Sequence, residues 1–125
     1  MSDDNVFTYE GPRPDVDWHH RVTKIIKSFR GGSVGRSSVY IALLRDVESS
    51  GNFGVYVGMT GKTPAERYHE HKQGYKAAKG WVKKYGICLL KTPHLWNIEN
   101  EDAVRIEREL AETLQRAGIL TKGGH

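Results

Sequence analysis

The chain has 125 residues, a formal net charge of +4 and one cysteine, Cys88. This length accommodates a single hydrophobic core, and one cysteine excludes an internal disulfide and a zinc site built from several thiolates. No apolar run is long enough to span a bilayer, and the acidic residues at positions 3 and 4 are unlike a signal peptide, so we expect a cytoplasmic protein that does not enter membranes.

Residues 1–36 are expected to form an N-terminal arm followed by a helix. The arm contains two prolines and shows little periodicity, which indicates a loose segment. From Val16 to Phe29, apolar residues recur at spacings of three and four, which predicts an amphipathic helix. Three glycines between Arg30 and Ser38 then predict a flexible connector to the main unit, residues 37–125.

Two strands are expected at the start of the main unit. Val39–Asp46 and Val55–Met59 are short and rich in β-branched and aromatic residues, with a loop between them. If the strands form an antiparallel hairpin, their alternation places Tyr40 and Tyr56 on the same side of the sheet. Two phenols side by side indicate hydroxyl groups that have partners or a chemical role.

A helix with a clear start follows the second strand. Thr63 and Glu66 have the spacing of a capping box, which predicts a helix from Thr63 to about Gln73. Arg67 and His71 lie one turn apart on a cationic and aromatic face, and Glu70 is expected on the other side. The alternative is an intrahelical pair of Arg67 and His71 on an exposed face.

The remainder of the chain predicts two more helical stretches and one strand. A short helical stretch ends at Tyr85, and Ile87–Leu90 reads as a third strand, buried on both faces. Lys91–Ile98 is expected to be a loop, and Glu99–Gly118 the last helix.

One carboxylate of the last helix stands apart from the others. Glu107 falls beside the apolar stripe formed by Ile106, Leu110 and Leu114, whereas the other carboxylates lie on the opposite side. A carboxylate removed from water needs a cation or hydrogen-bond donors to offset its desolvation. Glu107 therefore needs such a partner in the fold, and a boundary salt bridge with an arginine is the simplest one.

Positive charge is concentrated in the middle of the chain. Residues 60–91 contain eight basic and two acidic residues, with Tyr68, Tyr75, Trp81 and Tyr85 between them. Such a segment is typical of a nucleic-acid surface, although a solvated helical face is the alternative. The lysines predicted to contact nucleic acid are Lys62, Lys72, Lys76, Lys79, Lys83 and Lys84.

These motifs, taken in order, resemble those of the GIY-YIG nuclease superfamily. The match covers about residues 37–125 and is most similar to small stand-alone bacterial or phage members, which end in a Gly-Gly-His tail as this chain does. The corresponding residues are Ser38-Val39-Tyr40, Tyr56-Val57-Gly58, Arg67, His71 and Glu107.

The resemblance implies an α+β fold with a three-stranded antiparallel sheet flanked by helices. It also implies endonuclease activity on DNA, by hydrolysis of phosphodiester bonds with one Mg²⁺, or Mn²⁺ in its place. Glu107 would bind the metal and Arg67 the scissile phosphate. Tyr40 would be the general base, and Tyr56 and His71 would orient the attacking water.

The chain departs from the family pattern at three points. Ser38 replaces the first glycine of the motif, and the two tyrosines are separated by 15 residues, more than is usual. No asparagine follows Asn100, and His125 is the candidate to replace the family's late asparagine. A nucleic-acid-binding module without turnover and a ribonuclease on the same scaffold stay open as alternatives, as does targeting by homodimer formation or by a partner protein.

Overall fold

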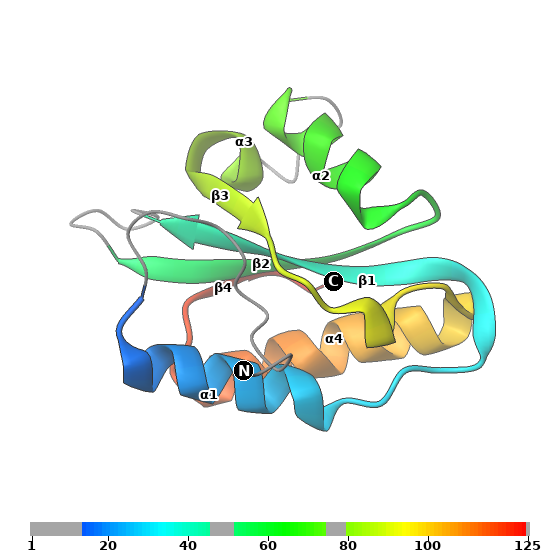
Figure 1. The fold of residues 1–125 in the computed structure, drawn as a ribbon, viewed down its shortest axis with the longest axis horizontal. Helices are drawn as coiled ribbons and strands as arrows, with labels where there is room; N and C mark the ends of the chain where they lie inside the picture. Colours follow the sequence, from blue (N-terminus) through cyan, green and yellow to red (C-terminus); the bar gives the residue numbers. More distant parts are fainter. Residues whose placement is uncertain (1–13, 46–51, 75–79, 125) are drawn as a thin grey trace, which may run out of the picture.

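The computed structural model describes residues 14–45, 52–74 and 80–124, which form one sheet with helices on both of its faces (Figure 1). This arrangement confirms the predicted α+β class. Among the described residues, no helix has both the length and the apolar content needed to cross a membrane. In chain order the elements are α1 (Val16–Ser28), β1 (Val34–Arg45), β2 (Phe53–Thr60), α2 (Pro64–Lys72), α3 (Trp81–Tyr85), β3 (Gly86–Leu89), the 3-10 helix η1 (Pro93–Leu95), α4 (Asn100–Arg116) and β4 (Thr121–Gly123).

The sheet has four strands in the order β3-β1-β2-β4. β1 pairs antiparallel with both β2 and β3, whereas β4 runs parallel to β2, with Val57 opposite Gly123. The prediction of a three-stranded antiparallel sheet was therefore wrong. Residues 121–123 are too few to show a strand pattern, and glycine is a poor strand former, so it is backbone pairing with the edge of β2 that holds them extended.

β1 begins at Val34, inside the stretch that was predicted to be a flexible connector. The backbone N–H of Gly35 donates to the carbonyl oxygen of Asn97 at 3.0 Å, and a Cβ on Gly35 would lie 2.6 Å from the backbone of Glu99. This glycine therefore allows close backbone packing. The prediction failed because a glycine that permits close packing and one that permits flexibility look the same in the sequence.

β3 is an edge strand of the sheet. Its residues Gly86–Leu89 are all only partly buried, and full burial is reached at Leu90, just beyond the strand. The expectation of a strand buried on both faces was wrong, because an apolar run does not reveal whether its strand lies in the centre or at the edge of a sheet.

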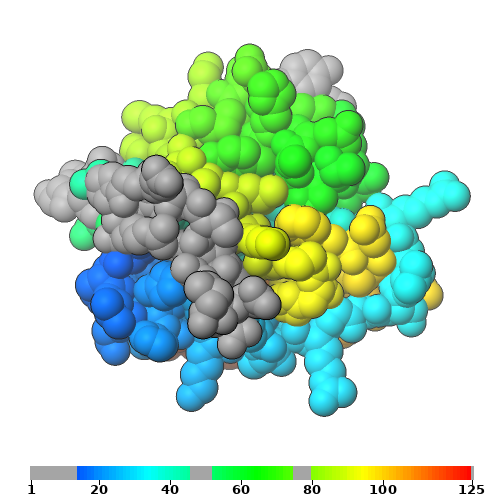
Figure 2. Space-filling model, in the orientation of Figure 1, coloured from blue at the N-terminus to red at the C-terminus, as the bar shows by residue number. Residues whose placement is uncertain are grey.

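The two faces of the sheet are covered by different helices. α1 and α4 lie on one side, and α2 and α3 on the other (Figure 1). In the space-filling view the green and yellow-green surface of α2 and α3 lies opposite the blue surface of α1 (Figure 2). A small apolar cluster under α2 and α3 contains Tyr40, Tyr56 and Val82.

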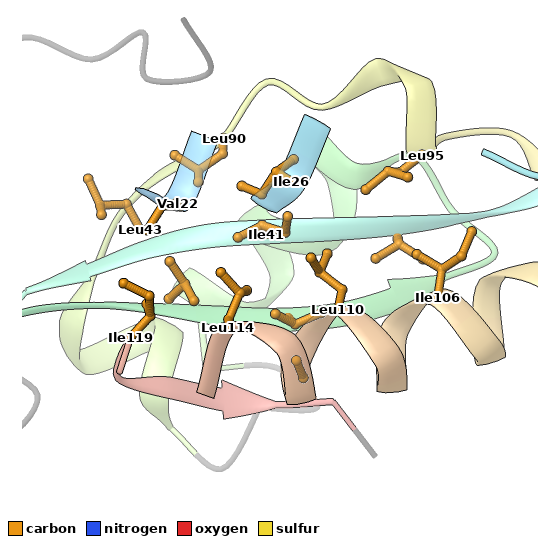
Figure 3. Packing of buried hydrophobic residues seen from close by; sticks show 14 of the residues in the cluster. Val22, Ile26, Ile41, Leu43, Leu90, Leu95, Ile106, Leu110, Leu114 and Ile119 are labelled. Carbon is orange, nitrogen blue, oxygen red and sulfur yellow. The ribbon is translucent and has the colours of Figure 1, made fainter. Parts of the chain in front are cut away.

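The larger core lies between the sheet and helices α1 and α4 (Figure 3). Val22 and Ile26 from α1 meet Ile41 from β1, with Leu110 and Leu114 from α4, and all five side chains are inaccessible to solvent. The apolar stripes predicted for both helices are thus confirmed. This core anchors α4 against β1 and β2, which fixes the position of Glu107 relative to the sheet.

Candidate active site

Tyr40 and Tyr56 lie side by side on the face of the sheet that α2 and α3 cover. Their ring centroids are 6.2 Å apart, as the antiparallel register of β1 and β2 predicted. Gly58 is the sheet partner of Tyr40, and a Cβ on Gly58 would lie 2.6 Å from the Tyr40 hydroxyl oxygen. The glycine of the second motif therefore gives the first tyrosine room to lie across β2.

His71 completes a three-ring cluster with the two tyrosines. Its Nε2 lies 2.8 Å from the Tyr40 hydroxyl oxygen, and its ring centroid is 6.0 Å from the centroid of each tyrosine ring. The His71 side chain is buried, with only 2% of the residue exposed. The alternative of an exposed intrahelical pair is therefore wrong for His71.

The start of α2 sets the direction from which His71 approaches the sheet. The Thr63 hydroxyl accepts the backbone N–H of Glu66 at 3.1 Å, and the Glu66 carboxylate accepts the backbone N–H of Thr63 at 3.1 Å. These hydrogen bonds lower the pKa of the Glu66 carboxyl group. The predicted capping box is confirmed, and it begins the helix directly after β2.

Arg67 lies at the edge of the cluster and is paired with Glu70. Arg67 Nη1 is 3.0 Å from Glu70 Oε1, and the Lys62 ammonium group contacts the other carboxylate oxygen. These two cations lower the pKa of Glu70. The placement of Glu70 on the far side of α2 was wrong, because residues three apart are neighbours on a helix. This spacing was the signal that could have identified Glu70 as part of the site.

The Tyr40 phenol keeps its proton in this environment. Burial raises the pKa of Tyr40 most, and Tyr56 also raises it, while Arg67 lowers it through its charge and a hydrogen bond. Burial and the nearby Arg67 charge lower the pKa of His71, so its imidazole is neutral near pH 7. In the His71 tautomer that carries its proton on Nδ1, the phenol donates its hydrogen and Nε2 of His71 accepts it.

Glu107 enters the site from α4 and is almost fully buried. Only 6% of the residue is exposed, and burial raises the pKa of its carboxyl group to about 7. The charge of Glu107 raises the pKa of both Tyr40 and Tyr56, so the carboxylate lies near the phenols. Within the described ranges no hydrogen bond or ion pair reaches the Glu107 side chain. The boundary salt bridge with an arginine that was considered for Glu107 is therefore not found among the described residues.

The last strand brings the sheet edge and α4 together beside Glu107. A Cβ on Gly123 would lie 2.9 Å from the Tyr56 ring, and one on Gly124 would lie 3.6 Å from the backbone carbonyl oxygen of Glu107. Both glycines have φ near +80°, which other residues rarely adopt. Glycine at these positions thus lets the backbone run between the phenol and the helix.

A single buried carboxylate fits a magnesium ion better than a zinc ion. No group of three or more His, Cys, Asp or Glu side chains that could hold a metal is found in the part of the chain that the structure describes. Mg²⁺ takes one or two carboxylates and completes its coordination with waters and substrate phosphates. A bound cation would offset the desolvation of the Glu107 carboxylate, whose protein partners are missing among the described residues.

The predicted nucleic-acid lysines fall into three groups. Lys62 lies at the edge of the site beside Glu70, and Lys83 and Lys84 are exposed on α3. The Lys72 ammonium group donates to the carbonyl oxygens of Gly86, at 2.9 Å, and Lys83, at 3.4 Å, so it joins α2 to the end of α3. Three predicted residues lie outside the described ranges: Lys76, Lys79 and His125.

Ser38 and Lys122 make contacts that the sequence did not predict. The Ser38 hydroxyl accepts the backbone N–H of Asn97 at 2.9 Å, so the serine in the first motif anchors the loop before α4. Lys122, which the sequence did not single out, pairs with Tyr56 in the sheet, and its Nζ lies 4.5 Å from the Trp81 ring centroid. No periodic signal could find Lys122, because β4 is only three residues long.

The site gathers side chains from four elements. Tyr40, Tyr56 and His71 are in direct contact, and the charges of Arg67 and Glu107 act on both phenols. The arrangement gathers a guanidinium cation, a neutral imidazole and a buried carboxylate around the two phenols. Comparison of the chain with models of protein families, with curated proteins and with solved structures gives no match.

Proposed function

We propose that the protein is a metal-dependent endonuclease that hydrolyses phosphodiester bonds in DNA with a GIY-YIG-type site. The observation that carries the proposal is the hydrogen-bonded pair of Tyr40 and His71, with the charges of both Arg67 and the buried Glu107 acting on the Tyr40 phenol. A general base, a phosphate clamp and a metal ligand are the groups that metal-assisted hydrolysis of a phosphodiester requires.

Glu107 is the residue that would hold the metal, which is Mg²⁺, with Mn²⁺ able to replace it. When bound, the cation supplies Lewis-acid activation of the scissile phosphate and stabilises the leaving oxygen. The protein contributes a carboxylate that α4 holds in a nearly dry position. Because burial raises the pKa of Glu107 to about 7, metal binding near pH 7 releases the proton from the fraction of Glu107 that carries one.

Arg67 is placed to bind the non-bridging oxygens of the phosphate. A guanidinium group has five N–H donors, and the contact with Glu70 through Nη1 leaves others for the substrate. Glu70 and Lys62 hold the guanidinium in position, because one carboxylate bridges both cations. The preorganised cation then stabilises the charge that develops on the phosphate in the transition state.

Tyr40 and His71 form a relay that removes a proton from the attacking water. The water oxygen forms a bond to phosphorus, its proton passes to the Tyr40 oxygen, and the phenol proton passes to Nε2 of His71. The bond from phosphorus to the leaving oxygen breaks in the same displacement. The phenol therefore needs no free phenolate form, which its burial opposes, because the neutral His71 imidazole is the base. Tyr56 helps to orient the water from the neighbouring strand.

Cleavage assays on supercoiled plasmid, single-stranded DNA and RNA, each with Mg²⁺ and with Mn²⁺, test this proposal. We expect plasmid cleavage by the wild-type protein and a rate loss of more than about a hundredfold in Glu107→Gln, because a metal contributes several kcal/mol to such a reaction. DNA binding by the variant should change little, since the lysines and Arg67 remain.

Two results would contradict the proposal. Binding of DNA without cleavage by the wild-type protein in both metals would make the chain a binding module. Cleavage of RNA with no cleavage of either DNA substrate would make it a ribonuclease. Glu112→Gln is the matched control, because Glu112 is an exposed carboxylate on the same helix and its substitution should leave cleavage unchanged.

A further inference from the structure

We infer that four residues beside the tyrosine pair form a subsite for a single-stranded segment of DNA, an inference that rests on the proposed function for its choice of ligand. We call them the stacking strip: Lys122, Trp81, Tyr85 and Lys84. Lys122 lies on β4, and the other three belong to α3. The strip implies a substrate with unpaired bases next to the bond that is cut.

The strip consists of two stacked rings with a lysine in contact with each. Lys122 Nζ is 4.5 Å from the Trp81 ring centroid, and the rings of Trp81 and Tyr85 are stacked with their centroids 6.1 Å apart. Lys84 Nζ is 5.4 Å from the Tyr85 ring centroid. Both rings are half-buried, so each anchors one edge in the protein and leaves part of its surface open. Single-stranded nucleic acid is bound by such combinations of aromatic faces and backbone-tracking cations.

The charge of this region favours a polyanion. Residues 71–98 contain six lysines and no Asp or Glu. Among the described residues, neither Lys84 nor Lys122 lies within ion-pair distance of a carboxylate. Their protein contacts are with the aromatic rings, which a flexible lysine can leave when a phosphate offers a charge-assisted contact.

The strip begins at the candidate active site. Lys122 is the sheet partner of Tyr56, and Trp81 and Tyr85 pack against the apolar cluster that contains Tyr40 and Tyr56. A strand whose phosphate lies at Arg67 and Tyr40 can therefore continue past Lys122 onto α3. The same surface cannot stack on the bases of a duplex, because neighbouring base pairs cover their faces.

A purely structural role for the rings makes different predictions. α3 has five residues and lacks a side-chain cap, so the stacked pair could serve only to hold it against the sheet. In that case any apolar side chain at position 81 that preserves folding would preserve DNA binding. If bases stack on Trp81, an aromatic ring is required and its fluorescence changes when single-stranded DNA binds.

Binding measurements in EDTA separate the two roles without any cleavage. Fluorescence anisotropy with a thymidine oligonucleotide and a matched duplex is compared for the wild-type protein, Trp81→Leu, Trp81→Phe and Lys122→Gln. We expect Trp81→Leu to weaken single-strand binding at least about fivefold, Trp81→Phe to retain it, and duplex binding to change less than twofold in both. Lys122→Gln should reduce the salt slope of single-strand binding by about 0.7.

The control is Lys24→Gln, because Lys24 is an exposed lysine on α1, on the opposite side of the sheet, and its loss should leave the salt slope unchanged. Tryptophan emission provides the second measurement. Quenching by the oligonucleotide in the wild-type protein should be absent in Trp81→Phe, although that variant still binds. Thermal melts identify any variant that has failed to fold, and Trp81→Phe and Lys122→Gln keep the test valid if Trp81→Leu unfolds.

Equal losses of single-strand and duplex binding in Trp81→Leu, or binding without fluorescence quenching, would overturn the stacking strip. These outcomes are independent of catalysis. If the protein shows the expected binding but cuts no substrate, the stacking strip is supported and the proposed function is wrong. If the protein cuts duplex DNA but its single-strand binding does not depend on Trp81, the proposed function is supported and the stacking strip is wrong.

Discussion

The hydrogen bond between Tyr40 and His71 joins a phenol that resists ionisation to an imidazole that resists protonation. Burial acts on both groups in the direction that favours the neutral form, so it raises the pKa of Tyr40 and lowers that of His71. In the proposed relay the Tyr40 phenol gains one proton as it gives up another and stays neutral, whereas the His71 imidazole gains a proton and becomes a cation. This pairing gives both residues a defined task that neither could perform as well alone.

Replacing Tyr40 by phenylalanine tests the relay. We expect kcat to fall by about 10² to 10⁴, the usual contribution of a positioned acid–base group, with little change in DNA binding. The variant leaves His71 Nε2 without its partner, which should lower the free energy of unfolding by about 1 kcal/mol. Single-turnover cleavage and thermal unfolding measure the two effects, and unchanged cleavage in Tyr40→Phe would remove Tyr40 from the mechanism.

The pH dependence of stability should report the buried Glu107 carboxyl group in metal-free protein. Its pKa is about 7 in the fold and near 4.5 in the unfolded chain, so the folded state binds the proton more tightly between these values. The contribution of Glu107 therefore becomes less favourable as pH rises from 4.5 to 7. Relative to Glu107→Gln, the wild-type protein should lose about 3 kcal/mol across this window.

Denaturant titrations in EDTA at pH 4.5 and pH 7.5 measure this difference. The comparison with Glu107→Gln cancels the titration of other groups, including His71, whose lowered pKa acts in the opposite direction. Mg²⁺ added at pH 7.5 should recover part of the loss for the wild-type protein and not for the variant. If the stability difference between the wild-type protein and Glu107→Gln does not change with pH, the Glu107 carboxylate is exposed to water.

α2 is the element whose start decides where Arg67 and His71 lie. Thr63→Ala removes half of the capping box, which we expect to cost about 1 kcal/mol of folding free energy. α2 carries Arg67 and His71, the proposed phosphate clamp and base. The loss in cleavage rate, converted to a free energy, should therefore exceed the loss in folding free energy. Ser28→Ala, at the exposed end of α1, is the control. If the two free-energy losses are equal, the capping box matters only for folding.

The sequence predicts elements well where local chemistry is specific. The Thr63 and Glu66 capping box, the stripe of α4 and the shared face of Tyr40 and Tyr56 follow from spacing alone, and the structure confirms them. β4 could not be predicted, because it is held by pairing with β2 and carries no pattern of its own.

The polar part of the site was harder to predict than its rings. The ion pairs of Glu70 with Arg67 and Lys62 depend on side-chain direction, which a helical wheel gives only approximately. Lys122 joins the site through β4, so it was missed together with that strand. The contacts of Lys72 with α3 depend on how two helices pack, and no local pattern describes that packing.

At the scale of the whole molecule, the sheet divides the apolar side chains into two clusters of unequal size. The larger one joins α1 and α4 to the sheet, and the smaller one, which includes the tyrosine pair, lies under α2 and α3. The two α2 residues that we propose to be catalytic, Arg67 and His71, thus depend on the smaller cluster. Glu107, the proposed metal ligand, belongs to the helix that the larger cluster holds.

This division into two clusters affects which part of the protein unfolds first. Regions with fewer buried apolar contacts exchange their backbone amide hydrogens through partial unfolding, at a lower free energy than the whole domain requires. We expect the amides of α2 and α3 to exchange with deuterium much faster than those of α4, in a single cooperative step that leaves α1 and α4 protected. Mass spectrometry of peptic fragments resolves the two groups, and uniform exchange rates would show one cooperative unit. The half of the site that carries the proposed DNA contacts would then be the half able to unfold locally, while the proposed metal ligand Glu107 stays in a protected helix.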